Sequence, residues 1–199
     1  GDGMIKAILL TLKLPILSTK WFLKPASKDK GDADIATFVQ DNLFTMSNTW
    51  ESLLRHVLLM LDFGYMVFEK VWKIDSYNGK DSVLYKKIAP RMQRTIYKWL
   101  PDAEGGLSGI KWQGYKTEGI TSTYKTVFIP VDKLLVFTHE QEGGNFAGIS
   151  ALRSAYTHWW IKKNLYKIEA FGLERNATGY PTIKLPGGFT QALKTAAIN

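Results

Sequence analysis

Residues 143–163 read Gly-Gly-Asn-Phe-Ala-Gly-Ile-Ser-Ala-Leu-Arg-Ser-Ala-Tyr-Thr-His-Trp-Trp-Ile-Lys-Lys, and a helical pattern then continues to Gly179-Tyr180-Pro181. A glycine loop therefore opens onto a long predicted helix over 149–177, rich in aromatic and lysine side chains. The Gly-x-Pro step ends this helix, because glycine suits a left-handed cap and proline cannot continue a helix. No catalytic arrangement of acid, base and nucleophile lies in the stretch, so we interpret it as an assembly element.

Composition sets the limits within which the rest of the chain is interpreted. The 199 residues suffice for one domain or a closely packed pair, and a hydrophobic content of 45% supports a real core. The chain has seven Trp and nine Tyr. Because these residues favour interfaces, we expect some of the rings to face another subunit. Cysteine is absent, which excludes disulfides, thiolate metal sites and cysteine nucleophiles and fits a reducing compartment.

The formal net charge is +8, from 26 Lys+Arg against 18 Asp+Glu. Such an excess favours a polyanion or an acidic partner surface. The alternative is a basic protein that has no nucleic-acid partner, and charge alone leaves both interpretations open.

The apolar run over residues 4–17 has some features of a signal peptide or a membrane span. It is too short for a span, and Lys6, Lys13 and Pro15 interrupt it. No small-residue cleavage pattern follows it. We therefore expect a buried amphipathic helix over 3–14, ended by Pro15, and no membrane partner. Both ends of the sequence are abrupt, which predicts a piece of a longer polypeptide.

Helices are predicted before residue 64. A short strand over 20–24 precedes a helix capped by Asp32, whose side chain can accept a free backbone N–H. A capping box formed by Asn48 and Glu51 then starts the strongest helical pattern in the chain. Gly64 is its natural terminator.

From Tyr65 the apolar period changes from helical to two, which predicts a strand buried mainly on one side. Asn78-Gly79 predicts a tight hairpin. Further short strands are expected over 82–88, 94–99, 107–113, 125–129 and 134–138. After the long helix we expect a short strand over 181–185 and a last helix. The predicted fold class is α+β: helices flank a small antiparallel β-sheet or barrel-like module, with the long helix after it.

Little in the sequence indicates catalysis. His56 and His158 lack clustered partners, and we assign them structural roles. His139-Glu140 is the only pair suited to acid–base work, and it lacks a third group. The glycines at 143, 144 and 148 fit neither a Walker nor a Rossmann motif, so we interpret the loop as a mobile connection. Ser150 is the predicted N-cap of the long helix. We expect no enzyme activity, no cofactor and no metal.

Two roles stay open for the basic and aromatic side chains of the long helix. Lys162, Lys163 and Lys167 can contact a phosphate backbone, or they can form a solvated face while the rings pack inside. We take these three lysines as the candidate nucleic-acid contacts. The candidate subunit-interface residues are Tyr156, Trp159 and Trp160.

The order of several short segments adds a family resemblance. These segments are Trp21-Phe22-Leu23-Lys24-Pro25-Ala26, Phe63-Gly64-Tyr65, Phe68-Glu69-Lys70-Val71-Trp72, Lys87-Ile88-Ala89-Pro90, Lys133-Leu134-Leu135-Val136-Phe137-Thr138-His139, Gly148-Ile149-Ser150-Ala151-Leu152-Arg153, His158-Trp159, Lys162-Lys163, Glu174-Arg175 and Gly179-Tyr180-Pro181. In this order and spacing, the chain resembles the N-terminal part of tailed-bacteriophage portal proteins of the Mu type and of related long-tailed phages.

The resemblance implies a homo-oligomeric ring, usually of twelve subunits, at one capsid vertex of the virion, assembled in the host cytoplasm. Double-stranded DNA would pass through the ring, and terminase, capsid and head–tail adaptor proteins would bind it. Residues 1–64 would be the N-terminal helical part of the wing, 65–140 its β-rich module, and 141–199 the glycine loop, the long helix and the start of the segment leading to the stem. The stem, clip and tunnel loop would follow later in the polypeptide. The alternatives are a basic nucleic-acid-binding module of another assembly and, third, a small enzyme using His139 and Glu140.

Overall fold

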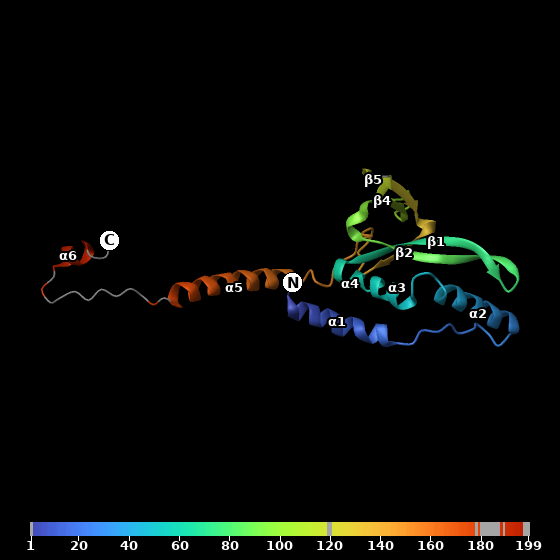
Figure 1. Cartoon of the computed structure of the whole chain (residues 1–199), viewed down its shortest axis with the longest axis horizontal. Helices are drawn as coiled ribbons and strands as arrows, with labels where there is room; N and C mark the ends of the chain where they lie inside the picture. Colours follow the sequence, from blue (N-terminus) through green and yellow to red (C-terminus); the bar gives the residue numbers. More distant parts are fainter. Residues whose placement is uncertain (1, 119–120, 178, 180–187, 189, 197–199) are drawn as a thin grey trace. The chain divides into compact units, whose positions relative to one another are not determined.

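The computed structural model describes residues 2–118, 121–177, 179, 188 and 190–196 (Figure 1). The chain forms two compact units, Gly1–Ala155 and Tyr156–Asn199, and each is described by itself. The α+β fold class is confirmed, since helices precede and follow the strands. The expected strand over 181–185 lies outside the described residues.

The first helix, α1 (Gly3–Ser18), differs from its prediction in two respects. It continues through Pro15, whose fixed φ suits a helix, and the hydroxyls of Ser18 and Thr19 donate to the Pro15 carbonyl at 3.0 and 2.8 Å. It is also not buried: every residue is at least partly exposed, and Met4 and Leu12 are 66% and 53% exposed.

Three further helices follow, α2 (Lys30–Phe44), α3 (Trp50–Val57) and α4 (Leu59–Phe63), and both predicted N-caps are wrong. Asp29 occupies the N-cap position of α2 without a side-chain cap hydrogen bond, and Asp32 lies in the first turn. Thr49 caps α3 by accepting the Ser52 N–H at 3.2 Å. Asn48 instead bonds the N–H and C=O of Ile88, both at 3.2 Å. The side-chain amide of an asparagine can cap a helix or bond to the backbone of a strand. The strand that contains Ile88 therefore decides which of the two Asn48 does.

The segment over 20–24 is extended but does not belong to a sheet, so the predicted strand there is wrong. The end of α4 is as predicted, because Gly64 adopts a left-handed φ of +91°.

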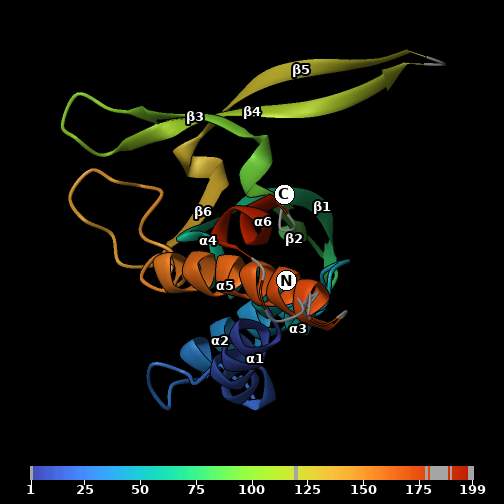
Figure 2. The same cartoon turned by 90° about the vertical axis from the view of Figure 1, so that its left-hand side faces the viewer.

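Within the described residues, six strands form two antiparallel sheets, and Figure 2 shows how they lie. The first sheet has the order β2-β1-β6, from β1 (Tyr65–Tyr77), β2 (Lys80–Arg91) and β6 (Leu134–Thr138). The second has the order β3-β4-β5, from β3 (Ile96–Pro101), β4 (Leu107–Glu118) and β5 (Thr121–Pro130). Short 3-10 turns, η1 (Gln93–Thr95) and η2 (Val131–Lys133), connect the two sheets. The predicted hairpin is confirmed, since Asn78 and Gly79 both have positive φ, 52° and 76°.

Strand β1 is buried on both faces, and the prediction of one-sided burial is wrong over its first half. Met66, Val67 and Phe68 are each 0% exposed. Met66 and Phe68 pack against the helices, in a cluster with Met46, Leu53 and Ile88. Val67 packs against the second sheet, in a cluster with Ile110, Ile129 and Leu134. The first unit is therefore layered as helices, first sheet, second sheet, with β1 at its centre.

Polar contacts fasten the layers to each other. The Arg91 guanidinium pairs with Glu69 through Nε at 3.0 Å and stacks 4.4 Å above the Trp112 ring of the second sheet. On the helical side, the Asn42 side chain accepts the Tyr85 N–H at 2.7 Å. The Tyr77 hydroxyl donates to Asp41 at 2.9 Å, and this bond raises the pKa of Tyr77.

The second unit contains α5 (Tyr156–Ala177) and α6 (Gln191–Ala196). The long helix ends at the predicted residue, Ala177, but the predicted start at 149 is wrong. Residues 151–155 form turns, and α5 begins only at Tyr156. The reason lies in the contacts of Ile149 to Ala151, described below.

Replacing Phe68 by Ala is expected to lower the free energy of unfolding by about 3–5 kcal/mol, because it opens a cavity beneath α3. Ile74→Ala is the matched control: it lies on the same strand but is 77% exposed, and we expect a change within about 0.5 kcal/mol. Urea unfolding of both variants measures the difference. Equal losses would contradict the central position of the first half of β1.

Candidate functional site

At the end of α4, three backbone carbonyls accept hydrogen bonds from residues far along the chain. We call residues 61–64, together with the backbone and side-chain groups that contact them, the α4 junction. The carbonyls of Leu61 and Gly64 accept the N–H groups of Ala151 and His139 at 3.0 and 2.8 Å. The Asp62 carbonyl accepts the Ser150 hydroxyl at 2.6 Å. The segment that leads into α5 is thus held against α4.

Two glycines let backbones touch at this junction. Gly64 and Gly148 have φ of +91° and +57°. A Cβ at Gly64 would lie 2.6 Å from the Ala147 carbonyl oxygen, and one at Gly148 would lie 2.6 Å from the Gly64 oxygen. Both positions therefore require glycine for conformation and for space. The loop was expected to be a mobile connection, yet its Gly148 end is tightly packed, whereas Gly143 has open space around it.

Ser150 is not the N-cap of the long helix, which corrects that prediction. Its hydroxyl donates to Asp62 and accepts the Leu152 N–H at 3.1 Å, six residues before α5 begins. The Asp62 carboxylate binds Lys13 of α1 at 2.7 Å, and these side chains are only 19% and 14% exposed. One turn of α4 thus positions α1, β1, β6 and the approach to α5.

The His139–Glu140 pair lines an open hollow of about 470 Å³ together with Ser150, Arg153 and Ser154. The His139 Nδ1 atom lies 2.8 Å from the Ile149 carbonyl oxygen, so Nδ1 carries the proton and donates it. The Ser150 hydroxyl is directed to Asp62. Imidazole and hydroxyl therefore each bind backbone instead of each other, which gives no support for an activated nucleophile. Across the described ranges, no group of three or more His, Asp or Glu side chains is placed to hold a metal ion.

The candidate lysines of α5 do not share one side of the helix. Lys163 and Lys167 are four residues apart and lie on one side, whereas Lys162 lies about 100° around the axis from Lys163. The Lys163 ammonium sits 5.2 Å over the Trp159 ring, and the Lys162 ammonium sits 5.5 Å over the Tyr166 ring. Two of the three lysines thus lie over aromatic rings of their own helix, and the Tyr166 ring is still 59% exposed.

The candidate interface residues are clustered only in part. Tyr156 and Trp159 have ring centroids 5.9 Å apart, whereas Trp160 lies about 100° around the axis from Trp159 and is 55% exposed. Other apolar side chains of α5 are exposed on several sides: Ile161, Leu165, Ile168, Phe171 and Leu173. Exposed apolar side chains on several sides of one helix are a feature of surfaces that contact another molecule. Of the helices that the structure describes, none is long and apolar enough to cross a bilayer.

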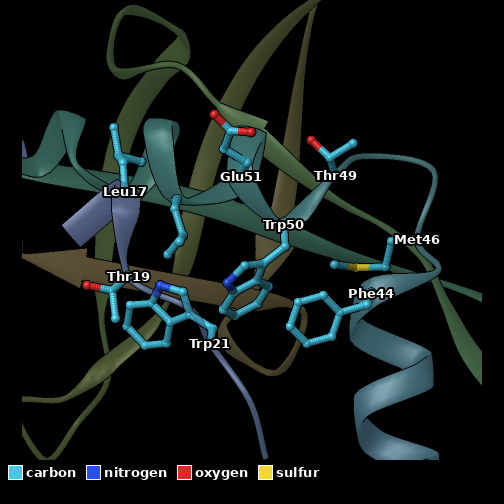
Figure 3. Close-up of a pocket in the computed structure, with 9 residues that line it drawn as sticks. Leu17, Thr19, Trp21, Phe44, Met46, Thr49, Trp50 and Glu51 are labelled. Carbon is cyan, nitrogen blue, oxygen red and sulfur yellow. The ribbon is translucent and has the colours of Figure 1, made fainter. Parts of the chain in front are cut away.

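An aromatic hollow of about 400 Å³ lies between the end of α1, the end of α2 and the start of α3 (Figure 3). The Trp50 ring is 6.0 Å from Trp21 and 5.5 Å from Phe44, between centroids. Figure 3 shows the nitrogen-bearing edge of Trp50 turned toward Trp21. Trp21 and Phe44 remain 46% and 44% exposed, so the aromatic rings of the hollow are accessible, and polar side chains including Glu51 line it beside them. Sequence reasoning missed it, although the number of aromatic residues was a signal for such a surface.

Comparison with protein families adds an independent finding. The family described as "Portal protein of Mu bacteriophage" matches residues 1–198. The match spans every helix and strand described above.

We expect Gly148→Ala to lower the free energy of unfolding by about 3 kcal/mol or more, because it adds a collision with backbone to the strain of positive φ. Gly143→Ala isolates the second effect: its φ is +54°, and an added Cβ meets nothing within 4 Å. For this control we expect a loss of about 1–2 kcal/mol. Urea unfolding measures both, and equal losses would refute the close backbone contact.

Proposed function

The chain belongs to the Mu bacteriophage portal protein family, and from this premise we propose that it forms the wing region of a ring at one capsid vertex. Double-stranded DNA passes through this ring during packaging and ejection, and terminase and head–tail adaptors dock on it. The ring has about twelve subunits, the number usual for portals. The observation that carries the proposal is the family match over residues 1–198.

Within the wing, we propose that residues 1–64 are the N-terminal helical part, 65–140 the β-rich module and 141–199 the segment that leads to the stem. Membership of a portal family places the protein in the virion capsid. Assembly of the ring in the host cytoplasm, before DNA enters, is part of the proposal.

Ring closure requires two different complementary surfaces on each subunit, since a head-to-tail contact joins unlike faces. The free chain exposes apolar surface on α1, on α5 and at the aromatic hollow. Trp and Tyr are the side chains that most often anchor such contacts. We propose that Tyr156, Trp159 and Trp160 contribute to the contact between neighbouring subunits.

The proposed role is structural and does not involve bond making. DNA transit needs a surface that attracts phosphates without reading bases or holding one register. A net charge of +8, spread over the chain, suits that requirement. Lys162, Lys163 and Lys167 remain proposed phosphate contacts, and Lys163 and Lys167 would act together because they share a side of α5.

Electron microscopy of the full-length protein tests the ring directly. We expect closed rings with about twelve-fold symmetry. A monomer that persists at high concentration would refute the proposal, and a monomer that also binds duplex DNA would favour the nucleic-acid-binding alternative.

Trp160→Asp is expected to reduce the fraction of protein in rings about 10-fold or more, since a charge replaces an exposed apolar anchor. The fold should be unaffected, because Trp160 is already 55% exposed. His158→Asp is the control, with the same new residue on another side of α5. Size-exclusion chromatography with light scattering gives the ring fraction, and circular dichroism checks the fold. If Trp160→Asp and His158→Asp behave alike, Trp160 is not an anchor.

A further inference from the structure

The second sheet has one buried and one open face. Trp99 and Ile110 are paired across β3 and β4 and point into the core beside Val67. Because side chains alternate along a strand, the next pair, Lys98 and Lys111, points to the opposite, outer face. Both lysines are exposed. Phe128 of β5 pairs with Lys111, so two lysines and a phenyl ring form one row across three strands.

The two lysines are an unfavourable pair within the fold. Like charges directly opposite each other on antiparallel strands are destabilising. Four other cations, Lys13, Arg55, Lys73 and Arg91, each pair with a carboxylate. Within the part of the chain that the structure describes, Lys98 and Lys111 have no such partner. An anion from outside the chain would offset this repulsion.

The Phe128 ring beside these lysines packs over Gly109. A Cβ at Gly109 would lie 2.7 Å from Cε2 of Phe128, so the ring occupies the space where a side chain at 109 would be. The ring is still 50% exposed. Tyr97, next to Lys98, is 66% exposed. An open aromatic ring seated on glycine, beside two cations, combines the two features with which proteins bind nucleic-acid strands: charge for phosphates and apolar surface for sugars or bases.

We propose that the outer face of the β3-β4-β5 sheet binds DNA, with Lys98 and Lys111 on the phosphates and Phe128 against the adjoining sugar or base. This inference rests on the proposed function for the identity of the polyanion. It deepens that function by assigning a DNA contact to the β-rich module, where sequence reasoning considered the lysines of α5. An acidic protein segment fits less well, because it would satisfy the charges but would not require the open ring.

The test uses the full-length protein and short fluorescent duplex and single-stranded DNA, with binding followed by anisotropy over a range of salt concentrations. Lys98→Gln with Lys111→Gln removes two phosphate contacts, so the slope of log K against log salt should fall by about 1.8. The control, Lys86→Gln with Lys87→Gln, removes the same charge from two exposed lysines of β2 and should leave the slope unchanged.

Two further readouts separate this site from general charge. Phe128→Ala should weaken binding about 5-fold or more without changing the salt slope, because it removes stacking and no charge. The double glutamine variant should melt at the same temperature as the parent or higher, since it relieves the repulsion. The comparison of duplex with single-stranded DNA shows whether sugars or unpaired bases contact the ring.

Three outcomes would overturn the inference: no DNA binding by the parent protein, an equal fall of the slope in the control, or full displacement of DNA from this face by polyglutamate. If the double glutamine variant forms normal subunit rings and binds DNA with an unchanged salt slope, this DNA site alone is refuted. DNA binding that depends on Lys98 and Lys111 in a protein that never forms rings would support the site and refute the proposed ring.

Discussion

The burial of β1 on both faces is the constraint on which the first unit depends. Met66 and Phe68 complete the core beneath the helices, and Val67, between them in sequence, completes the core beneath the second sheet. One strand thus belongs to two hydrophobic clusters. Each cluster alone is small, so both layers need this strand for stability. Strand β6, which pairs with β1, carries the same alternation through Leu134 and Leu135.

The residues just before β1 also contact the C-terminal segment of the first unit. Gly64 ends α4 and meets the backbone of Gly148, and the Ser150 hydroxyl binds Asp62 at the same point. These contacts hold residues 149–151 out of the helix that their sequence favours. A loop that is flexible by composition thereby becomes a fixed approach to α5.

Several surfaces of the free chain carry unfavourable features that contact with another molecule would offset. Apolar side chains are exposed on α1 and α5, aromatic rings line an open hollow, and Lys98 faces Lys111 across two strands. Each would be unfavourable in a protein that worked alone. Together they are what a subunit of an oligomeric assembly would be expected to show, and they agree with membership of a portal family.

Local patterns in the sequence determined the features that local chemistry controls. Asn78-Gly79 predicted the hairpin, Gly64 predicted the end of α4, and the change of apolar period at Tyr65 predicted where the sheet begins. The α+β class and the portal family followed from the order of such segments. Only the tertiary structure decided that β1 is buried on both faces, that Ser150 binds Asp62 instead of capping a helix, that Asn48 bonds to β2, and that Lys98 meets Lys111. The reason is physical: periodicity tells which side chains share a face, but contacts between residues some 13 to 90 positions apart depend on how strands and helices pack.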